Sequence, residues 1–371
     1  MSPYIHELSD WPHFFWDEKV LSRPLGLVRH RQGKLIGRME ALGFPLRVEA
    51  VLRTLTLDIV ESGEIEGVLF DKQQVRSSIA RQLGVDIGNT VPANRNVEGV
   101  VEMMLDATRN YDKPLTKDRL FAWHSCLFPT GRSGMNTIKV SAWRDDSKGP
   151  MQVVSGAVGH ERVHFEAPAA NRLESEMAAF LNWFNADGST DLVLRAGIAH
   201  LWFVTIHPFD DGNGRIARAI ADMILARSEG NPQRFYSMSA QIRSERDTYY
   251  RILEETQQGT LDITPYLEWF LDCLHRTFDN VDSTIGTVLK KASFWDTHEG
   301  EAFNDRQRLM LNRLLENFEG KLTSTKWAKL AKCSQDTALR DIIDLVTKEV
   351  LVKDPGGGRS TSYSLRSDTA Q

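Results

Sequence analysis

The stretch HPFDDGNGRIAR, residues His207–Arg218, determines how the rest of the sequence is interpreted. It follows the apolar run DLVLRAGIAHLWFVTI, residues 191–206, which predicts a helix. It leads into GRIARAIADMILARSEG, whose apolar spacing predicts a second helix that ends at Gly230. A packed core does not suit its polar groups, because Asp and Arg are seldom buried unpaired and Gly weakens a helix interior. The segment therefore requires either a structural explanation or a ligand.

The residue types in this stretch suit a phosphate group. A loop that enters a helix at Gly212–Gly214 exposes free backbone N–H groups at the positive end of the helix dipole. Arg215 and Arg218 lie three residues apart, so both project from one side of the first helical turns. Asp211 can hold Mg²⁺ together with phosphates, and His207 can take up a proton at neutral pH. Together they predict transfer of a phosphate-containing group from a nucleotide to a hydroxyl or similar nucleophile.

The His207–Arg218 stretch has two alternative interpretations, a purely structural helix junction and a calcium-binding loop. His207 and the arginines can simply cap and pair at a helix junction, an interpretation that holds well for any one residue but poorly for all of them at this spacing. A calcium loop starting at Asp211 would need an oxygen ligand where Arg215 stands and a glycine where Ile216 stands, so it is excluded.

The stretch matches throughout the HPFx[D/E]GNGRxxR signature of the Fic (Fido) proteins, and the resemblance extends from about residue 50 to 280. The resemblance implies a mainly α fold: a helical core with a small β-hairpin flap. It also implies that the chain is a protein adenylyltransferase, which transfers AMP from ATP to a Ser, Thr or Tyr hydroxyl of a target protein, with modification of the chain itself left open as an additional reaction.

The resemblance assigns a role to each position of the signature. It makes His207 the general base and Asp211 the residue that holds Mg²⁺. The other nucleotide-binding positions are Gly212, Asn213 and Gly214 at the α- and β-phosphates, Arg215 and Arg218 at the β- and γ-phosphates, and Ile216 and Ala217 between them. The small Gly214 favours AMP transfer, because the phosphorylating Doc branch carries lysine there.

Two further stretches fit the same family. The segment QVVSGAVGHERVHFEAP, residues 152–168, has the composition of a hairpin and resembles the flap that aligns a target side chain by strand-like pairing. Tyr249 and Tyr250 fall where the family contacts the nucleotide near adenosine. Ordinary helix packing explains this tyrosine pair equally well.

The flap also contains the pattern HExxH, residues His160–His164, which is typical of zinc proteases. That chemistry needs a helix to bring both histidines onto one face. Gly156 and Gly159 precede the pattern, and β-formers and Pro168 follow it, so a strand is expected and zinc hydrolysis is not.

The stretch SGEIEG predicts one short helical turn, with Ser62 able to cap it and Gly67 suited to its end. Beside the signature it resembles the family's inhibitory motif, [S/T]xxxE[G/N]. In that reading Glu66 pairs bidentately with Arg218 and takes the arginine meant for the γ-phosphate. ATP then binds with its α-phosphate misaligned. Some relatives use the equivalent glutamate to activate water and remove AMP, so Glu66 has two candidate roles.

Residues 300–371 predict three amphipathic helices followed by a strand, a Gly-rich turn and a strand, which resembles a winged helix-turn-helix domain. The predicted apolar stripes are Leu311, Leu314, Leu315 and Phe318; Trp327, Leu330 and Ala331; and Leu339, Ile342, Ile343 and Val346. The third helix carries Asp336, Asp341 and Asp344 beside Arg340, which is poor for a phosphate-facing surface. Contact with DNA or with a protein stays open, and a nucleotide-sensing DNA-binding transcriptional regulator is the alternative function.

Length, net charge and cysteine content restrict the class of protein and its expected compartment. It has 371 residues and a net charge of −5, so it has no general attraction to nucleic acid or to an anionic membrane. Its three cysteines form no CxxC pair, and no stretch has the length of a signal peptide or membrane span, so a cytoplasmic protein is expected. The expected parts are an N-terminal helical region (1–90), a catalytic core (91–285) and the C-terminal domain (300–371). Whether it forms a homodimer is left open.

Overall fold

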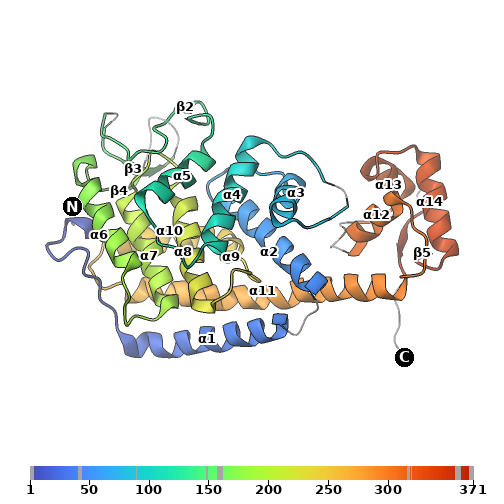
Figure 1. Ribbon diagram of the computed structural model, residues 1–371, viewed down its shortest axis with the longest axis horizontal. Coiled ribbons are helices and arrows are strands. Elements are labelled where there is room, and N and C mark those ends of the chain that lie inside the picture. The colour runs from blue at the N-terminus through green and yellow to red at the C-terminus, as the bar shows by residue number, and fades with distance from the viewer. Residues whose placement is uncertain are drawn as a thin grey trace. The chain divides into compact units, whose positions relative to one another are not determined.

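The computed structural model describes residues 4–40, 44–88, 90–147, 149–156, 162–315, 318, 320–355 and 361–366. It consists of two compact units, Met1–Asp282 and Ser283–Gln371. Both are mainly helical, and the described strands form three small antiparallel pairs. The predicted mainly α fold with a small hairpin is therefore confirmed (Figure 1).

The larger unit holds most of the helices. They are α1 Glu18–Glu40, α2 Phe44–Ile65, α3 Lys72–Leu83, α4 Arg95–Arg109, α5 Lys117–Leu127, α6 Leu173–Asn185, α7 Leu192–Ile206, α8 Asn213–Glu229, α9 Met238–Ser244, α10 Arg246–Gln257 and α11 Thr264–Thr297, which continues past Asp282. Two 3-10 turns, η1 Ile5–Glu7 and η2 Ala170–Arg172, and two strand pairs, β1 Arg132–Ser133 with β2 Asn136–Thr137 and β3 Gln152–Ser155 with β4 Arg162–Glu166, complete it.

Helix α7 is the centre of this unit. Its residues from Val193 to Ile206 are all buried, as expected for a helix that is apolar on every side. It packs on α8 and α6. At Gly197 a side chain would come within about 3 Å of Leu267 and Phe270, so glycine is what lets α11 approach α7 closely. This packing fixes the end of α7, where the signature begins.

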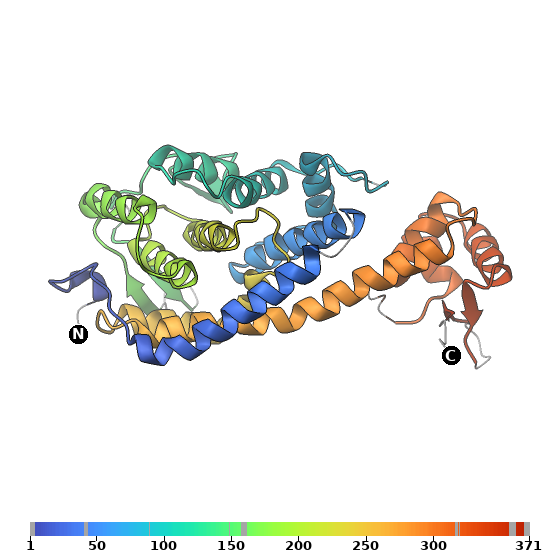
Figure 2. The same ribbon diagram turned by 60° about the horizontal axis from the view of Figure 1, so that its bottom comes forward.

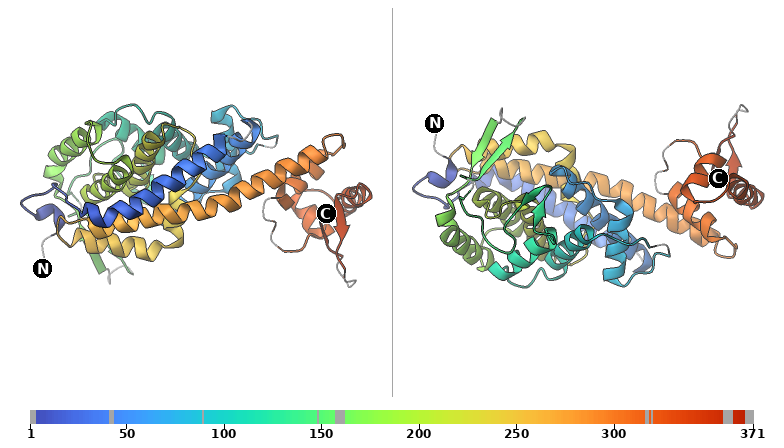
Figure 3. Two further views of the ribbon diagram at one scale, coloured as in Figure 1. Left: turned by 90° about the horizontal axis from the view of Figure 1, so that it is seen from below. Right: turned by 90° about the horizontal axis from the view of Figure 1, so that it is seen from above.

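The N-terminal segment packs onto this core. Helix α1 lies along α11 (Figures 2 and 3), and Arg31 pairs with Asp279 between them. Before α1, the rings of Trp11 and Phe14 contact Trp202 of α7 edge-on at 6.2 and 5.7 Å. These aromatic contacts anchor the start of the chain to the helix that leads into the signature.

Three predicted helix boundaries differ in the structure. From the sequence alone, RQGKLIGRMEALGF predicts a helix that ends at Gly43 with Pro45 as its stop; in the structure Pro45 lies in the first turn of the next helix, α2, where a missing N–H costs nothing. Ser62–Ile65 of the predicted separate turn SGEIEG are instead the last turn of α2, which runs unbroken to Ile65, and Glu66 and Gly67 form the turn that follows it. The single helix predicted over 239–259 is divided at Glu245 into α9 and α10. Residues 41–43, where the first helix was expected to end, lie outside the described residues.

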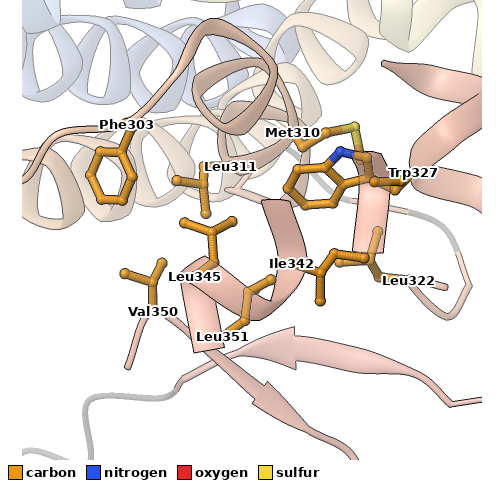
Figure 4. Packing of buried hydrophobic residues seen from close by; sticks show 10 residues of the cluster. Phe303, Met310, Leu311, Leu322, Trp327, Ile342, Leu345, Val350 and Leu351 are labelled. Atoms are coloured by element: carbon orange, nitrogen blue, oxygen red, sulfur yellow. The ribbon is translucent and has the colours of Figure 1, made fainter. Parts of the chain in front are cut away.

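The smaller unit contains α12 Asp305–Leu315, α13 Ser324–Leu330, α14 Gln335–Thr347 and the antiparallel pair β5 Leu351–Lys353 and β6 Tyr363–Leu365. Its core gathers side chains from all three helices and β5 around Trp327, which is fully buried (Figure 4). The order of elements is the predicted one, and the winged-helix assignment stays a prediction. Leu339 and Ile343 were wrongly placed in the core: they are 40% and 53% exposed, because only the Ala338–Ile342–Leu345 side of α14 faces inward.

Among the described residues, no helix is both long and apolar enough to cross a membrane. The thiols of Cys126, Cys273 and Cys333 are all free.

Candidate active site

The signature forms the connection between α7 and α8, and two residues set its shape. His207 ends α7 in the left-handed region (φ 51°, ψ 58°), and Gly212 precedes α8 with φ 81°. Between them the buried Asn213 side chain closes the loop: its Oδ1 accepts from Phe209 N–H (3.0 Å) and its Nδ2 donates to Phe209 O (2.8 Å). The Asn213 amide therefore holds the loop, and this residue can offer a ligand only its backbone N–H.

His207 is half-buried at the end of α7. Its Nδ1 lies 3.1 Å from the carbonyl oxygen of Val204, and because a carbonyl only accepts, Nδ1 carries the proton. In the neutral ring Nε2 is then the free base. Burial lowers the pKa of His207, and the nearby Arg144 guanidinium lowers it further. The imidazole is therefore neutral at physiological pH, as a general base must be.

Arg144 is a contributor that sequence reasoning missed. Its Nε donates to His207 O (2.8 Å), its backbone N–H to Pro208 O (2.9 Å), and its Nη2 to Pro168 O (2.5 Å). It therefore fixes the backbone at the start of the signature and ties it to the end of the flap. An isolated arginine in a loop segment gives no sequence pattern that would reveal this.

His124 and Ser133 were also missed. The His124 ring stacks on Phe209 at 4.2 Å, and its Nε2 lies 3.2 Å from Asp211 O. The Ser133 hydroxyl, from the small β1–β2 pair, donates to Oδ2 of Asp211. Both residues come from segments about 80 residues upstream, so only the fold brings them to the signature.

The Asp211 carboxylate is held in place but remains open on one side. Oδ1 accepts from Gly212 N–H (2.5 Å), and Arg215 Nη2 is 3.8 Å from it. About a third of the side chain is exposed (35%). No group of three or more His, Cys, Asp or Glu side chains among the described residues could hold a metal ion. One open carboxylate beside phosphate donors fits Mg²⁺, which commonly binds through one or two carboxylates and phosphates.

Several donors at the start of α8 have no acceptor. No hydrogen bond within the described residues uses the backbone N–H of Asn213, Gly214 or Arg215. Arg215 Nε and Arg218 Nη1 are buried without a hydrogen-bond partner among the same residues. Unsatisfied buried donors are rare and need an explanation. Here they surround Gly214, at the positive end of a 17-residue helix.

The Glu66 carboxylate lies at this same position. Its Oε1 accepts from Arg218 Nη2 (2.9 Å), and its Oε2 is 3.9 Å from Arg215 Nε. Oε1 also lies 1.9 Å from where a side chain on Gly214 would begin, so glycine is needed to admit it. Burial acts to lower the pKa of Arg218, but the Glu66 carboxylate, together with Tyr249 and Tyr250, raises it overall.

The expected bidentate pair of Glu66 with Arg218 is wrong in one respect. Only Nη2 of Arg218 donates to Glu66, and it also donates to Ser62 O (2.9 Å each); Nε donates to Ser62 Oγ (2.9 Å), and Nη1 has no partner among the described residues. Ile65 O accepts from Arg246 Nε (2.8 Å) and from the Tyr250 hydroxyl (3.2 Å). The end of α2 is thus fixed to both α8 and α10.

The remaining predicted residues lie in two kinds of environment. Ile216 and Ala217 are fully buried, so their side chains pack in the core. Tyr249 is 2% exposed and its hydroxyl is 3.3 Å from His200 Nε2, while Tyr250 is 37% exposed. Core packing thus accounts for the position of the Tyr249 side chain while Glu66 is paired with Arg218. Tyr250 is the member of the pair that a ligand can reach.

We expect Gly214→Ala to destabilise the larger unit. The new methyl group would displace the Glu66 carboxylate and leave Arg218 short of a buried charged hydrogen bond, which costs about 1–3 kcal/mol of unfolding free energy. Urea unfolding at neutral pH measures this. Gly26→Ala is the matched control, because that glycine lies in α1 with no atom within 4 Å of the added methyl. It should be neutral or stabilising, and equal effects of both substitutions would contradict the expectation.

The buried His200 makes the free energy of unfolding depend on pH. This imidazole is buried between the Tyr249 and Tyr266 hydroxyls, and burial lowers its pKa to about 3 from the ordinary 6.5. The folded state favours the neutral His200 ring, so stability is highest above pH 6.5, the pKa of the unfolded state. Below pH 6.5 the unfolded chain takes up a proton that the folded chain does not, and stability falls until the pH reaches the folded-state pKa of about 3. At pH 5 the loss is about 2 kcal/mol relative to pH 7.5. His200→Gln should reduce this change in urea unfolding, whereas His30→Phe, at an exposed position on α1, should not.

The flap prediction is confirmed for the described residues. Strands β3 and β4 pair antiparallel, with a bulge between Val153 and Val154. Arg162, Val163 and His164 of the HExxH pattern lie in β4, so this part of the pattern is not helical. His160 and Glu161 lie outside the described residues. β4 contacts α10, the helix that carries Tyr250 (Figure 1).

Comparison with known proteins identifies the class. Residues 114–225 match the Fic/DOC family, and residues 4–85 match a domain of unknown function, DUF4172. The chain therefore carries a Fic/DOC domain. "Protein adenylyltransferase Fic" of Drosophila virilis is 34% identical over 114 residues, 30% of this chain and 22% of that protein, and the protein of the same name from Culex quinquefasciatus is 35% identical over the same length, 21% of its own. The chain thus matches about a fifth of these relatives.

Solved structures extend the likeness in fold. A Fic family protein from Desulfovibrio desulfuricans G20 matches 96% of this chain and 99% of its own, with a TM-score of 0.55 and 20% identity. A Fic domain containing signaling protein from Bacteroides thetaiotaomicron matches 71% of this chain and 97% of its own, with a TM-score of 0.51 and 21% identity. The arrangement of helices around the signature is thus that of the Fic fold.

Proposed function

We propose that this chain is a protein adenylyltransferase that moves AMP from ATP to a hydroxyl of a target protein, and that Glu66 inhibits it. The observation that carries this proposal is the set of unpaired donors around Gly214, with a carboxylate already among them. An anion-binding position at a helix start, next to a neutral histidine with a free Nε2, suits nucleotide phosphates and hydroxyl activation.

The residues at hand account for each part of the transfer. Nε2 of His207 takes the proton of the attacking hydroxyl as its oxygen bonds to the α-phosphorus, and the bond from that phosphorus to the leaving pyrophosphate breaks. The free N–H groups of α8 and the guanidinium groups of Arg215 and Arg218 offset the charge that builds up. Asp211 would hold Mg²⁺, which when bound neutralises phosphate charge.

Inhibition follows from competition for the same donors. The Glu66 carboxylate occupies the position over Gly214 and takes Nη2 of Arg218, so a phosphate cannot use that donor while Glu66 is in place. The DNA-binding alternative gains no support from the smaller unit. The exposed side of α14 presents Leu339 and Ile343 beside Asp336, Arg340 and Asp344, while Asp341 is buried against Arg306; two exposed apolar side chains suit a protein surface better than phosphates.

Labelled ATP tests the proposed function. The Glu66→Gly chain is incubated with Mg²⁺ and ATP carrying ³²P at either the α- or the γ-phosphate, alone and with a cell lysate. We expect denaturation-resistant label on protein from the α-labelled nucleotide only. Label from the γ-phosphate would instead indicate phosphoryl transfer, and no label from either would overturn the proposal.

A further inference from the structure

A second polar contact joins the inhibitory helix α2 to α8, two turns before Glu66. Asp58, Ser62 and Glu66 follow one another at intervals of four residues, so they share one side of the α2 segment. Opposite them, Arg218 of α8 donates to both Ser62 and Glu66. Asp222, one turn further along α8, lies within hydrogen-bond reach of Asp58. The proposed inhibition uses the contacts at Ser62 and Glu66 and leaves the pair of acids unexplained.

Both carboxyl groups of this pair are buried: Asp58 is 4% exposed and Asp222 is 5% exposed. Oδ1 of Asp58 accepts from the Ser237 hydroxyl (2.5 Å) and from Ser239 N–H (3.3 Å). No N–H group and no Ser, Thr or Tyr hydroxyl of the described residues bonds its Oδ2. Two carboxylates cannot bond each other, because a carboxylate only accepts. Since Asp58 already accepts from two donors, we place a proton on Asp222, which donates it to Oδ2 of Asp58.

Arg234 balances the charge of the pair. Its Nη2 lies 2.9 Å from Oδ1 of Asp222, and its Nη1 donates to Asp222 O at 3.0 Å. The guanidinium is itself buried, with 3% of the residue exposed. With the shared proton in place, Asp58, Asp222 and Arg234 together carry no net charge. Without it they carry one buried negative charge in excess, which is unfavourable away from water.

The surroundings keep this proton in place at neutral pH. Burial and the facing Asp58 carboxylate raise the pKa of Asp222 to about 8, Glu229 acts in the same direction, and Arg234 acts against them. A small cavity beside Asp222 is otherwise lined by uncharged side chains of α8, α9 and α11. The other titratable groups around the pair are Glu61 on α2, the neutral His200 on α7, Arg218 (paired with Glu66) and Glu229 on α8, and Tyr236, which donates to Glu229.

We propose that the proton shared by Asp58 and Asp222 is a pH-sensitive lock on the inhibitory contact; this inference rests on the proposed function. When the O–H bond of Asp222 breaks and the proton passes to solvent, two buried carboxylates face each other and repel. Helix α2 then moves away from α8 and withdraws Glu66 from Arg218. A rise in pH thus relieves the inhibition in the unmodified chain.

The direction and the pH window of this effect follow from linkage. In contact with α2, Asp222 holds its proton up to about pH 8, whereas after separation its pKa returns to the ordinary 3.8. The contact between α2 and α8 is therefore strongest at low pH. It weakens by up to about tenfold for each pH unit as the pH rises toward 8, and it changes little above that.

AMP transfer from α-labelled ATP to lysate proteins tests the lock. The rate of the unmodified chain is divided by that of Glu66→Gly at each pH from 6 to 9, because this ratio cancels the effect of pH on the chemical step and on the targets. We expect the ratio to rise by up to about tenfold per pH unit until it levels off above pH 8. In Asp222→Asn, whose amide can still donate to Asp58 but does not titrate, the ratio should stay low throughout. Asp118→Asn, at an exposed position on α5, is the matched control and should keep the parental pH dependence.

Infrared spectroscopy tests the shared proton without relying on transfer. The unmodified chain should show the C=O band of a protonated carboxyl group at pH 6 that is lost at pH 9 and is missing from Asp222→Asn. Absence of this band, a ratio that does not change with pH, or the same rise in Asp222→Asn would overturn the lock and leave the proposed function standing. Absence of label from Glu66→Gly at every pH would overturn the proposed function and the lock together.

Discussion

Glu66→Gly is expected to raise AMP incorporation about 10- to 100-fold. The substitution removes the carboxylate from the position over Gly214 and frees Nη2 of Arg218 for phosphate. A hydrogen bond to a charged group contributes about 1.5–3 kcal/mol, and 1.4 kcal/mol corresponds to a factor of ten. Initial rates with α-labelled ATP, measured on the purified chain and on lysate proteins, give the ratio directly.

Glu64→Gly is the matched control for this variant. It makes the same change two residues earlier in α2, where Glu64 is part-exposed and lies 3.5 Å from Arg243. Both variants put glycine at the C-terminal end of α2, but only Glu66→Gly empties the position over Gly214. Equal rates in the two variants would mean that a weakened helix end, rather than the carboxylate, accounts for any release.

His207→Asn is expected to abolish most of the transfer, with a fall of about 10²–10⁴-fold in the Glu66→Gly background. Asparagine suits this position because it tolerates the left-handed backbone of residue 207, and its amide can still donate toward Val204 O. What it lacks is a base, because an amide nitrogen does not accept a proton near neutral pH. Single-turnover rates with α-labelled ATP measure the chemical step.

Nucleotide affinity separates catalysis from folding in this variant. Binding of ATP, followed by calorimetry, should match that of the Glu66→Gly parent within about threefold, because the phosphate donors of α8 are untouched. A variant that binds ATP normally and transfers AMP at the parental rate would exclude His207 as the base. A variant that fails to bind would point to a collapsed loop.

The strongly patterned parts of the chain were predictable from sequence. The helices on either side of the signature are set by apolar spacing and by Gly230, and the hairpin by its Val and Gly content. The contact between Glu66 and Arg218 followed from a resemblance between short motifs, but its form did not. Spacing alone does not show that the Ser62 hydroxyl and carbonyl occupy two of the donors of Arg218.

Local sequence patterns do not predict contacts between residues that lie far apart in the chain. Arg144 and His124 act through backbone carbonyls of the signature, and a carbonyl leaves no trace in the sequence of its partner. The exposed Leu339 and Ile343 show the complementary limit: helical periodicity marks apolar positions, but only packing decides which side of α14 is covered. The break at Glu245 likewise interrupts a pattern that is compatible with one continuous helix.

The unbroken course of α2 makes Glu66 the tip of a rigid lever. Its 22 residues span roughly 33 Å, so a tilt of roughly 5° about the far end displaces the tip by roughly 3 Å, about the length of the hydrogen bond to be broken. This lever belongs to the 4–85 segment, which matches a different family from the 114–225 segment that receives its tip. Under the function proposed above, a ligand or partner that tilts α2 by contacting the N-terminal segment would withdraw Glu66 from Arg218 and relieve the inhibition without unfolding the chain.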